Sequence, residues 1–105
     1  MFVSVTRLEL RSLWKLIPLI SLSGKIIKQA RQAKGNSFVA VSNHRLRFFY
    51  TMSSWDSKED MQAFMRSGFH ATAMTRSKEL SKTILSRNFE SEEVPEWGKV
   101  KKMLR

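Results

Sequence analysis

The first segment of the chain alternates between larger apolar side chains and other residues over positions 2–10. An alternation with a period of two is typical of a β-strand. One face of this strand carries Phe2 and Leu8, and the other face carries Val3 and Val5. Because neither face is purely polar, we expect both faces to be at least partly covered.

The next segment, residues 11–34, has apolar residues at helical spacing and is predicted to form a helix in two pieces. Proline lacks an amide hydrogen and clashes with the preceding turn, so a break or kink is expected near Pro18. Beyond it, the basic residues lie largely off the apolar stripe, which is typical of an amphipathic helix. Gly35 stands where the C′ residue of this helix is expected. The stripe consists of Leu19, Leu22, Ile26, Ala30 and Ala33.

Two further strands are predicted over residues 37–42 and 46–54. A short turn at residues 43–45, which begins with an asparagine, indicates that the two strands form a hairpin. The second strand is the most aromatic segment of the chain, and it is followed closely by Trp55. Its alternating faces carry different residues: Leu46, Phe48, Tyr50 and Met52 on one face, and Phe49 and Thr51 on the other.

The second half of the chain repeats the change from helix to strand. The segment Asp56-Ser57-Lys58-Glu59 has the spacing of a capping box, with Asp56 as the N-cap of a helix. Gly68 ends or kinks that helix, and a second helix is predicted over residues 69–82. A fourth strand follows over residues 83–89, and Pro95 fits the first turn of a terminal helix.

This order of elements is that of a ferredoxin-like α+β domain, β-α-β-β-α-β. We therefore expect one domain over residues 1–105, with a four-stranded antiparallel sheet and helices on one face. The other face would carry Val3, Val5, Val39 and Val41, and it would be too apolar for a monomer to leave exposed. Pairing two such sheets buries this face, so a homodimer is predicted.

The composition limits the chemistry that the protein can perform. The chain has 105 residues and no cysteine, which excludes disulfides and thiolate chemistry. The lack of cysteine agrees with a reducing compartment, and no secretion signal is seen at the start, so we expect a cytoplasmic protein. Two histidines are too few for an ordinary zinc site, so no metal centre is predicted.

The net charge of +10 is unevenly distributed along the chain. Residues 1–53 hold nine Lys/Arg and one Glu, a charge of +8, whereas residues 54–105 hold ten Lys/Arg and eight Asp/Glu, a charge of +2. Such a field attracts phosphates, anionic lipid head groups or acidic ligands. A solubilising surface explains the same charge equally well.

The most apolar stretch of the chain covers residues 13–22. It is about half the ~20 residues that a membrane span needs, and Lys15 and Pro18 interrupt it, so no span is predicted. Lys15, Lys25 and Arg31 flank or interleave the stretch, which is compatible with a helix lying on a membrane surface. We expect instead that it forms a wall of the protein's own core or pocket.

The middle of the chain resembles a known superfamily. The segment from Phe48 to His70 contains a strand that ends at Trp55, a capped turn, Met61 and Phe64 on a helix, and then the histidine. Together with the strand order, this segment resembles the dimeric α/β-barrel superfamily. Within that superfamily it is similar to the antibiotic-biosynthesis monooxygenase-like and spheroidene monooxygenase-like proteins.

The resemblance implies a monooxygenase-like protein that binds a small apolar or aromatic molecule between sheet and helices. Enzymes of this superfamily include cofactor-free oxygenases of polycyclic phenols, heme-degrading enzymes and a heme-dependent carotenoid oxygenase. The implied cofactor is therefore either none or heme. The apolar stretch around Pro18 departs from the compact small monooxygenases. A non-enzymatic ligand-binding or structural homodimer is the alternative interpretation.

The candidate catalytic residue is His70, because imidazole titrates near neutrality and binds metals. The same side chain could equally cap the helix break after Gly68 or bond to a backbone carbonyl. Aromatic residues on strands line pockets in some proteins and form cores or dimer contacts in others. The candidate ligand-binding residues are Trp55, Tyr50, Phe48, Phe64 and Met74.

Nucleic-acid binding is a further alternative, because RNA-recognition domains share this strand order and stack bases on sheet aromatics. The segment Arg47-Phe48-Phe49-Tyr50-Thr51-Met52 does not match the pattern of such domains and contains no glycine. RNA is therefore not the expected partner. The alternative of a basic protein that binds nucleic acid or a membrane surface stays open.

Overall fold

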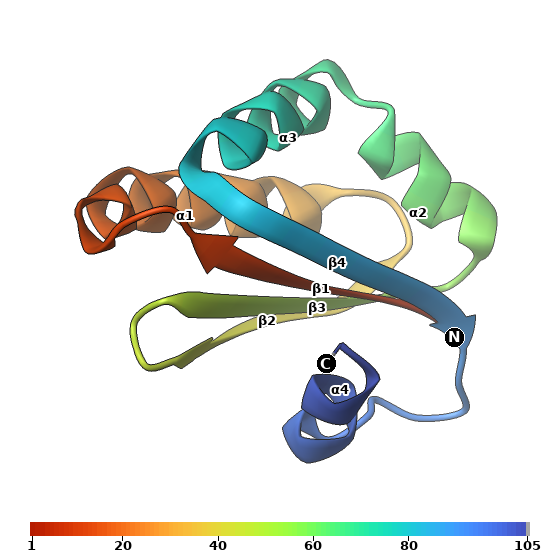
Figure 1. Cartoon of the computed structure of the whole chain (residues 1–105). Helices are drawn as coiled ribbons and strands as arrows, with labels where there is room; N and C mark the ends of the chain where they lie inside the picture. Colours follow the sequence, from red (N-terminus) through yellow and green to blue (C-terminus); the bar gives the residue numbers. More distant parts are fainter. Residues whose placement is uncertain (105) are drawn as a thin grey trace.

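The structure is a computed structural model that describes residues 1–104, with the backbone alone for residues 68–71. Four antiparallel strands form one sheet in the order β2-β3-β1-β4 (Figure 1). This arrangement confirms the predicted ferredoxin-like α+β fold. The strands are β1 (Phe2–Leu10), β2 (Asn36–His44), β3 (Phe48–Trp55) and β4 (Ser81–Glu90).

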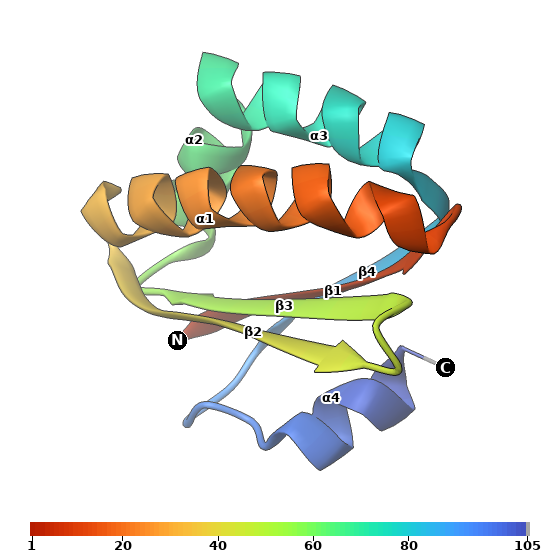
Figure 2. The ribbon, with the colours of Figure 1, turned by 90° about the vertical axis from the view of Figure 1, so that its left-hand side faces the viewer.

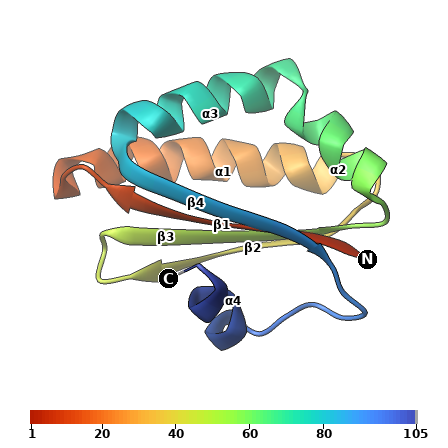
Figure 3. The ribbon, with the colours of Figure 1, turned by 45° about the vertical axis from the view of Figure 1, so that its right-hand side comes forward.

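Helices cover both faces of this sheet. A layer formed by α1 (Leu16–Gln32), α2 (Lys58–Met65) and α3 (Gly68–Leu80) lies over one face. The short helix α4 (Trp97–Met103) lies over the other face, as Figures 1 and 3 show from two directions. The prediction that helices cover one face only is therefore wrong, because the terminal helix folds back across the sheet.

The helix α1 is continuous through Pro18, where the sequence predicted a break. A short 3-10 helix, η1 (Leu13–Lys15), precedes it, and Pro18 is the third residue of α1. In the first turn of a helix the missing amide hydrogen of proline costs nothing, since that amide has no partner within the helix.

No helix among the described residues is long and apolar enough to cross a membrane.

The start of α2 is shifted by one residue from its prediction. Ser57, rather than Asp56, is the N-cap, and its hydroxyl accepts a hydrogen bond from the Asp60 amide at 3.1 Å. Gly35, on the loop that precedes β2, has a φ of 82°, and a Cβ at this position would overlap the Asp60 carboxyl group. Glycine is therefore required where this loop passes the first turn of α2.

The hairpin between β2 and β3 turns two residues later than predicted. Its central residues, Arg45 and Leu46, both have left-handed backbone angles, with φ of 55° and 59°. The Asn43 side chain accepts a hydrogen bond from the Leu46 amide at 3.1 Å, which holds the turn. The strands themselves pair as expected, with His44 opposite Phe48.

The strand register decides which residues share a face. Val41 lies opposite Thr51, and Thr51 lies opposite Thr6, so all three face α1, α2 and α3. Val3 and Val5 point the other way and are fully buried under α4 with Val100 and Leu104. The predicted grouping of Val3, Val5, Val39 and Val41 on one uncovered face is therefore wrong. The homodimer that was inferred from that face stays a prediction.

Candidate functional site: a cavity between sheet and helices

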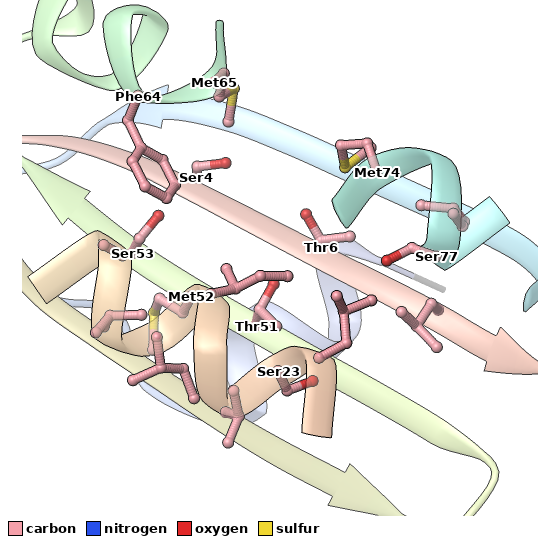
Figure 4. A pocket seen from close by; sticks show the side chains of 18 of the residues that line it. Ser4, Thr6, Ser23, Thr51, Met52, Ser53, Phe64, Met65, Met74 and Ser77 are labelled. Carbon is pink, nitrogen blue, oxygen red and sulfur yellow. The ribbon is translucent and has the colours of Figure 1, made fainter. Parts of the chain in front are cut away.

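A cavity of about 120 Å³ lies between the sheet and the helical layer. Its floor comes from β1 and β3, its roof from α1 and α3, and one end from α2 (Figure 4). Most of the residues that line the cavity are apolar, with long side chains that come from the helices and from the sheet edge. These are Leu8, Leu19, Leu22, Ile26, Ile27, Val39, Val41, Trp55, Phe64, Met65, Met74 and Ile84, together with Ala30. Met52 also borders the cavity, although it packs in the cluster on the opposite face with Val5.

Trp55 and Phe64 form the end wall of the cavity. Trp55 is 1% exposed, and its ring centroid lies 5.2 Å from that of Phe64 at an interplanar angle of 32°. The indole Nε1 donates a hydrogen bond to the Ser53 Oγ at 3.0 Å. The indole is therefore held by packing and by a directed bond, so that it presents a fixed aromatic surface.

Hydroxyl groups are the second property of the lining, and the sequence analysis did not identify them. Ser4 lies directly opposite Ser53, and Thr6 lies directly opposite Thr51, so four hydroxyls share one patch of the floor. Figure 4 shows Ser23 of α1 and Ser77 of α3 on the other side of the same space. The sequence of β1 indicates these hydroxyls, because the buried face of this strand continues from Phe2 through two hydroxyl residues.

The floor hydroxyls are available to a bound molecule. Within the described residues, the side chains of Ser4, Thr6 and Thr51 make no hydrogen bond, whereas Ser53 accepts the one from Trp55. Their oxygen atoms are not fully buried, so a ligand in the cavity can reach them, and a hydrogen bond to one of them would add to its affinity. None of the described residues that line the cavity is ionisable, so this part of the lining carries no charge.

The structure brings together three of the candidate ligand-binding residues and separates the other two. Trp55, Phe64 and Met74 line the cavity. Phe48 and Tyr50 lie on the opposite face, in the cluster under α4. The alternation of β3 places residues 48 and 50 on the face opposite residue 55, in agreement with the faces that the sequence predicted for this strand.

The contacts of Phe48 and Tyr50 explain their role in the structure. The Arg7 guanidinium lies 5.0 Å from the Phe48 ring centroid, and the Lys101 ammonium lies 5.3 Å from that of Tyr50. The contact of Lys101 with Tyr50 stabilises the packing of α4 on the sheet, whereas the contact of Arg7 with Phe48 joins the neighbouring strands β1 and β3. Both aromatic residues therefore serve this packed face in the structure.

The candidate catalytic residue His70 belongs to α3, but its side chain lies outside the described residues. Its proposed role is not tested by the geometry. Among the described residues, no group of three His, Asp or Glu side chains could hold a metal ion.

The cavity does not fit heme. Sites for drug-sized ligands and cofactors have volumes of roughly 300–1,000 Å³. The cavity, at about 120 Å³, is well below that range. It is close to the roughly 150 Å³ of an engineered protein cavity that binds benzene. A single ring therefore matches the space, and a porphyrin does not.

Several solved structures have the same fold as this chain. A proposed antibiotic biosynthesis monooxygenase from Deinococcus radiodurans superimposes with a TM-score of 0.81 at 21% identity, over 91% of this chain and 97% of that one. SnoaB, a cofactor-independent oxygenase from Streptomyces nogalater, gives a TM-score of 0.74 at 11% identity, over 89% and 94%. A proposed antibiotic biosynthesis monooxygenase from Nitrosomonas europaea gives 0.79 at 10% identity, over 87% and 89%.

These structures define the fold class of the chain. It is the ferredoxin-like fold of the antibiotic biosynthesis monooxygenase structures, the fold of the dimeric α/β barrels. No protein-family model matches the chain, and no curated protein matches it in sequence. The likeness therefore concerns the path of the chain and not its substrate.

Proposed function

We propose that the protein binds a small neutral aromatic molecule, with one or two hydrogen-bonding groups, in the cavity between sheet and helices. The observation that carries this proposal is the combination of an apolar lining with a neutral patch of unpaired hydroxyls. A ring would pack between Trp55 and the helical side chains, and a phenol or carbonyl oxygen would pair with Thr6 or Thr51. The small volume favours a single ring over a polycyclic one.

Oxygenation is the reaction class that the likeness to SnoaB supports for this site. In a reaction without a cofactor, a base removes a proton from an activated ring carbon and the resulting carbanion gives its electrons to O₂. One oxygen atom enters the substrate, and the other leaves as water when a CH₂ group becomes C=O. Among the described lining residues none can act as that base, so we propose His70 for this role.

Binding is tested by calorimetry and by thermal melting with simple phenols of one to three rings. We expect one-ring phenols to raise the melting temperature and larger ones to have no effect. Thr6→Val and Thr51→Val keep the shape of the side chain and remove the hydroxyl, so each is expected to weaken binding about tenfold, equivalent to about 1.4 kcal/mol. Thr83→Val, on the exposed part of β4, is the matched control: it removes a hydroxyl that donates a hydrogen bond to Glu9 outside the cavity, and it should leave ligand binding unchanged.

Catalysis is tested separately with the same ligands. An oxygen electrode follows O₂ consumption with a one-ring substrate that carries an acidic CH₂ group, and product mass shows whether one oxygen atom is added. His70→Ala should abolish turnover and retain binding. Tight binding without O₂ consumption in the unaltered protein would instead show a ligand-binding protein that is not an enzyme. If the Thr6→Val and Thr51→Val variants bind the ligand as tightly as the unaltered protein, the hydroxyl patch is not a binding site.

A further inference from the structure

The first half of α1 and the 3-10 helix before it carry large apolar side chains on the outside of the molecule. Trp14 is 84% exposed, Ile17 is 71% exposed and Ile20 is 57% exposed, while the neighbouring Leu13 is 55% exposed. Helical spacing places these residues on one face and turns Leu19, which is 2% exposed, toward the cavity. The expectation that residues 13–22 form a wall of the core is therefore wrong for the outward half of the stretch.

The second half of α1 continues the same outward face with positive charge. Lys25, Lys28 and Arg31 recur every three residues, and all three are exposed. Within the described residues none of them forms an ion pair. No Asp or Glu occurs between residues 10 and 55, so nothing nearby in the sequence offsets this charge.

The outward face of α1 therefore has an apolar end and a cationic end along a single helix. Figure 2 shows α1 running across the outer side of the helical layer, with no other helix in front of it. Exposed apolar patches with a polar rim are typical of interaction sites. An exposed tryptophan next to basic residues is typical of helices that lie in the interface of a membrane.

We propose that this face of α1 binds the surface of an anionic lipid membrane, with the helix parallel to the bilayer plane. Trp14, Ile17 and Ile20 would enter the boundary between head groups and acyl chains. Lys25, Lys28 and Arg31 would contact the anionic head groups. The helix is too short and too polar to cross the bilayer, so it lies on the surface.

The charge favours lipid over other occupants of this face. A second copy of the chain would bring like charges together, because the cations continue along the same helix face. A nucleic acid would pair with the cations but would leave Trp14, Ile17 and Ile20 in water. An anionic membrane satisfies both ends of the helix. The proposal does not depend on what the cavity binds, since the cavity is lined by the inward face.

The test is co-sedimentation of the purified chain with vesicles. Vesicles of phosphatidylcholine and phosphatidylglycerol should bind the protein, and vesicles of phosphatidylcholine alone should bind it about tenfold less well or worse. Binding should weaken as salt is raised, because salt screens the cations. Tryptophan emission should shift to the blue on binding, and Trp14→Phe should remove most of that shift while keeping the binding.

Variants separate the two ends of the face. Ile17→Ser with Ile20→Ser should lower vesicle affinity about tenfold or more, because the apolar insertion is lost. Lys25→Glu with Lys28→Glu should lower it as much and should also remove the preference for anionic lipid. Leu46→Ser and Lys82→Glu change an exposed apolar residue and an exposed cation elsewhere, and they should leave binding unchanged.

Four results would overturn the proposal. These are equal binding to neutral and anionic vesicles, unchanged binding of the Ile17→Ser, Ile20→Ser variant, equal loss in the two control variants, and self-association that depends on Trp14. Light scattering of the unaltered protein and of Trp14→Ser detects the last of these. Each variant is expected to fold, because all the changed residues are exposed. Circular dichroism checks this.

Discussion

The two faces of the sheet are covered in different ways. Under α4, Val5, Val100 and Leu104 pack in one cluster and are almost completely inaccessible to water. On the other face, three longer helices cover the sheet but leave a cavity of about 120 Å³. The number of covering helices therefore does not decide how well a face is packed.

The difference arises from the side chains of the sheet itself. The face under α4 carries valine, tyrosine and methionine from β1 and β3. The opposite face carries Ser4, Thr6, Thr51 and Ser53 at its centre, and these short side chains cannot reach the helices. We infer that one face mainly stabilises the fold, while the other leaves room for a ligand.

The largest effect is expected from a charge on the packed face. Val5→Asp places a carboxylate at a site with 0% exposure and with apolar neighbours, so the free energy of unfolding should fall by more than about 3 kcal/mol. Urea unfolding followed by circular dichroism measures this loss. Leu46→Asp, in the exposed hairpin, is the control and should change stability by less than about 0.5 kcal/mol.

Added volume should have opposite effects on the two faces. Val5→Leu overfills a packed site and should cost about 1–3 kcal/mol. Ser23→Leu places its added carbon atoms in the cavity and should stabilise the fold by about 1 kcal/mol, while ligand binding is lost. Thermal melting with and without a one-ring phenol gives both results. If both changes destabilise to the same degree, the cavity is not empty space.

A smaller effect is expected where the end wall is held in place. Ser53→Ala removes the acceptor of the Trp55 Nε1 hydrogen bond and should cost about 1–2 kcal/mol, because the indole N–H is left unpaired. The near-ultraviolet circular dichroism of the indole should also change. Ser42→Ala, on the same hairpin, is the comparison, and the near-ultraviolet signal should stay the same in that variant.

The smallest effect on stability is expected from a substitution in the hairpin turn, which alters neither face of the sheet. Leu46→Gly relieves a left-handed backbone at φ 59° in the hairpin turn and should raise the free energy of unfolding by roughly 0.5–1 kcal/mol. Urea titration detects a change of this size. Ligand affinity should be unaltered, so a change in affinity would show that the turn and the cavity are coupled.

The fold class could be predicted from the sequence because it depends on local periodicity. The alternation of β1 and the helical stripe of α1 are readable without any knowledge of the third dimension. The Pro18 break was wrong because a proline near a predicted helix start fits the first turn as well as it interrupts a helix. The position of that start depends on η1, which has no capping side chain to mark it.

The site could be predicted only in part, because a cavity depends on distant segments. Trp55, Phe64 and Met74 line the cavity, whereas Phe48 and Tyr50 lie on the opposite face of β3, and ligand binding by any of the five stays a prediction. The hydroxyl patch requires the register between β1 and β3, and the covered face requires the docking of α4. Neither is encoded in a local pattern, since both depend on residues that are far apart in the chain.

The central place of β1 has a consequence for how the protein is made. The Arg7 side chain of β1 donates a hydrogen bond to the carbonyl of Leu104, which lies 97 residues further along the chain. Contacts of such long separation form late, and apolar strands stay uncovered until they form. We therefore expect Val3 and Val5 to stay exposed during synthesis on the ribosome until α4 has emerged, and we expect the nascent chain to be most prone to aggregation over that period.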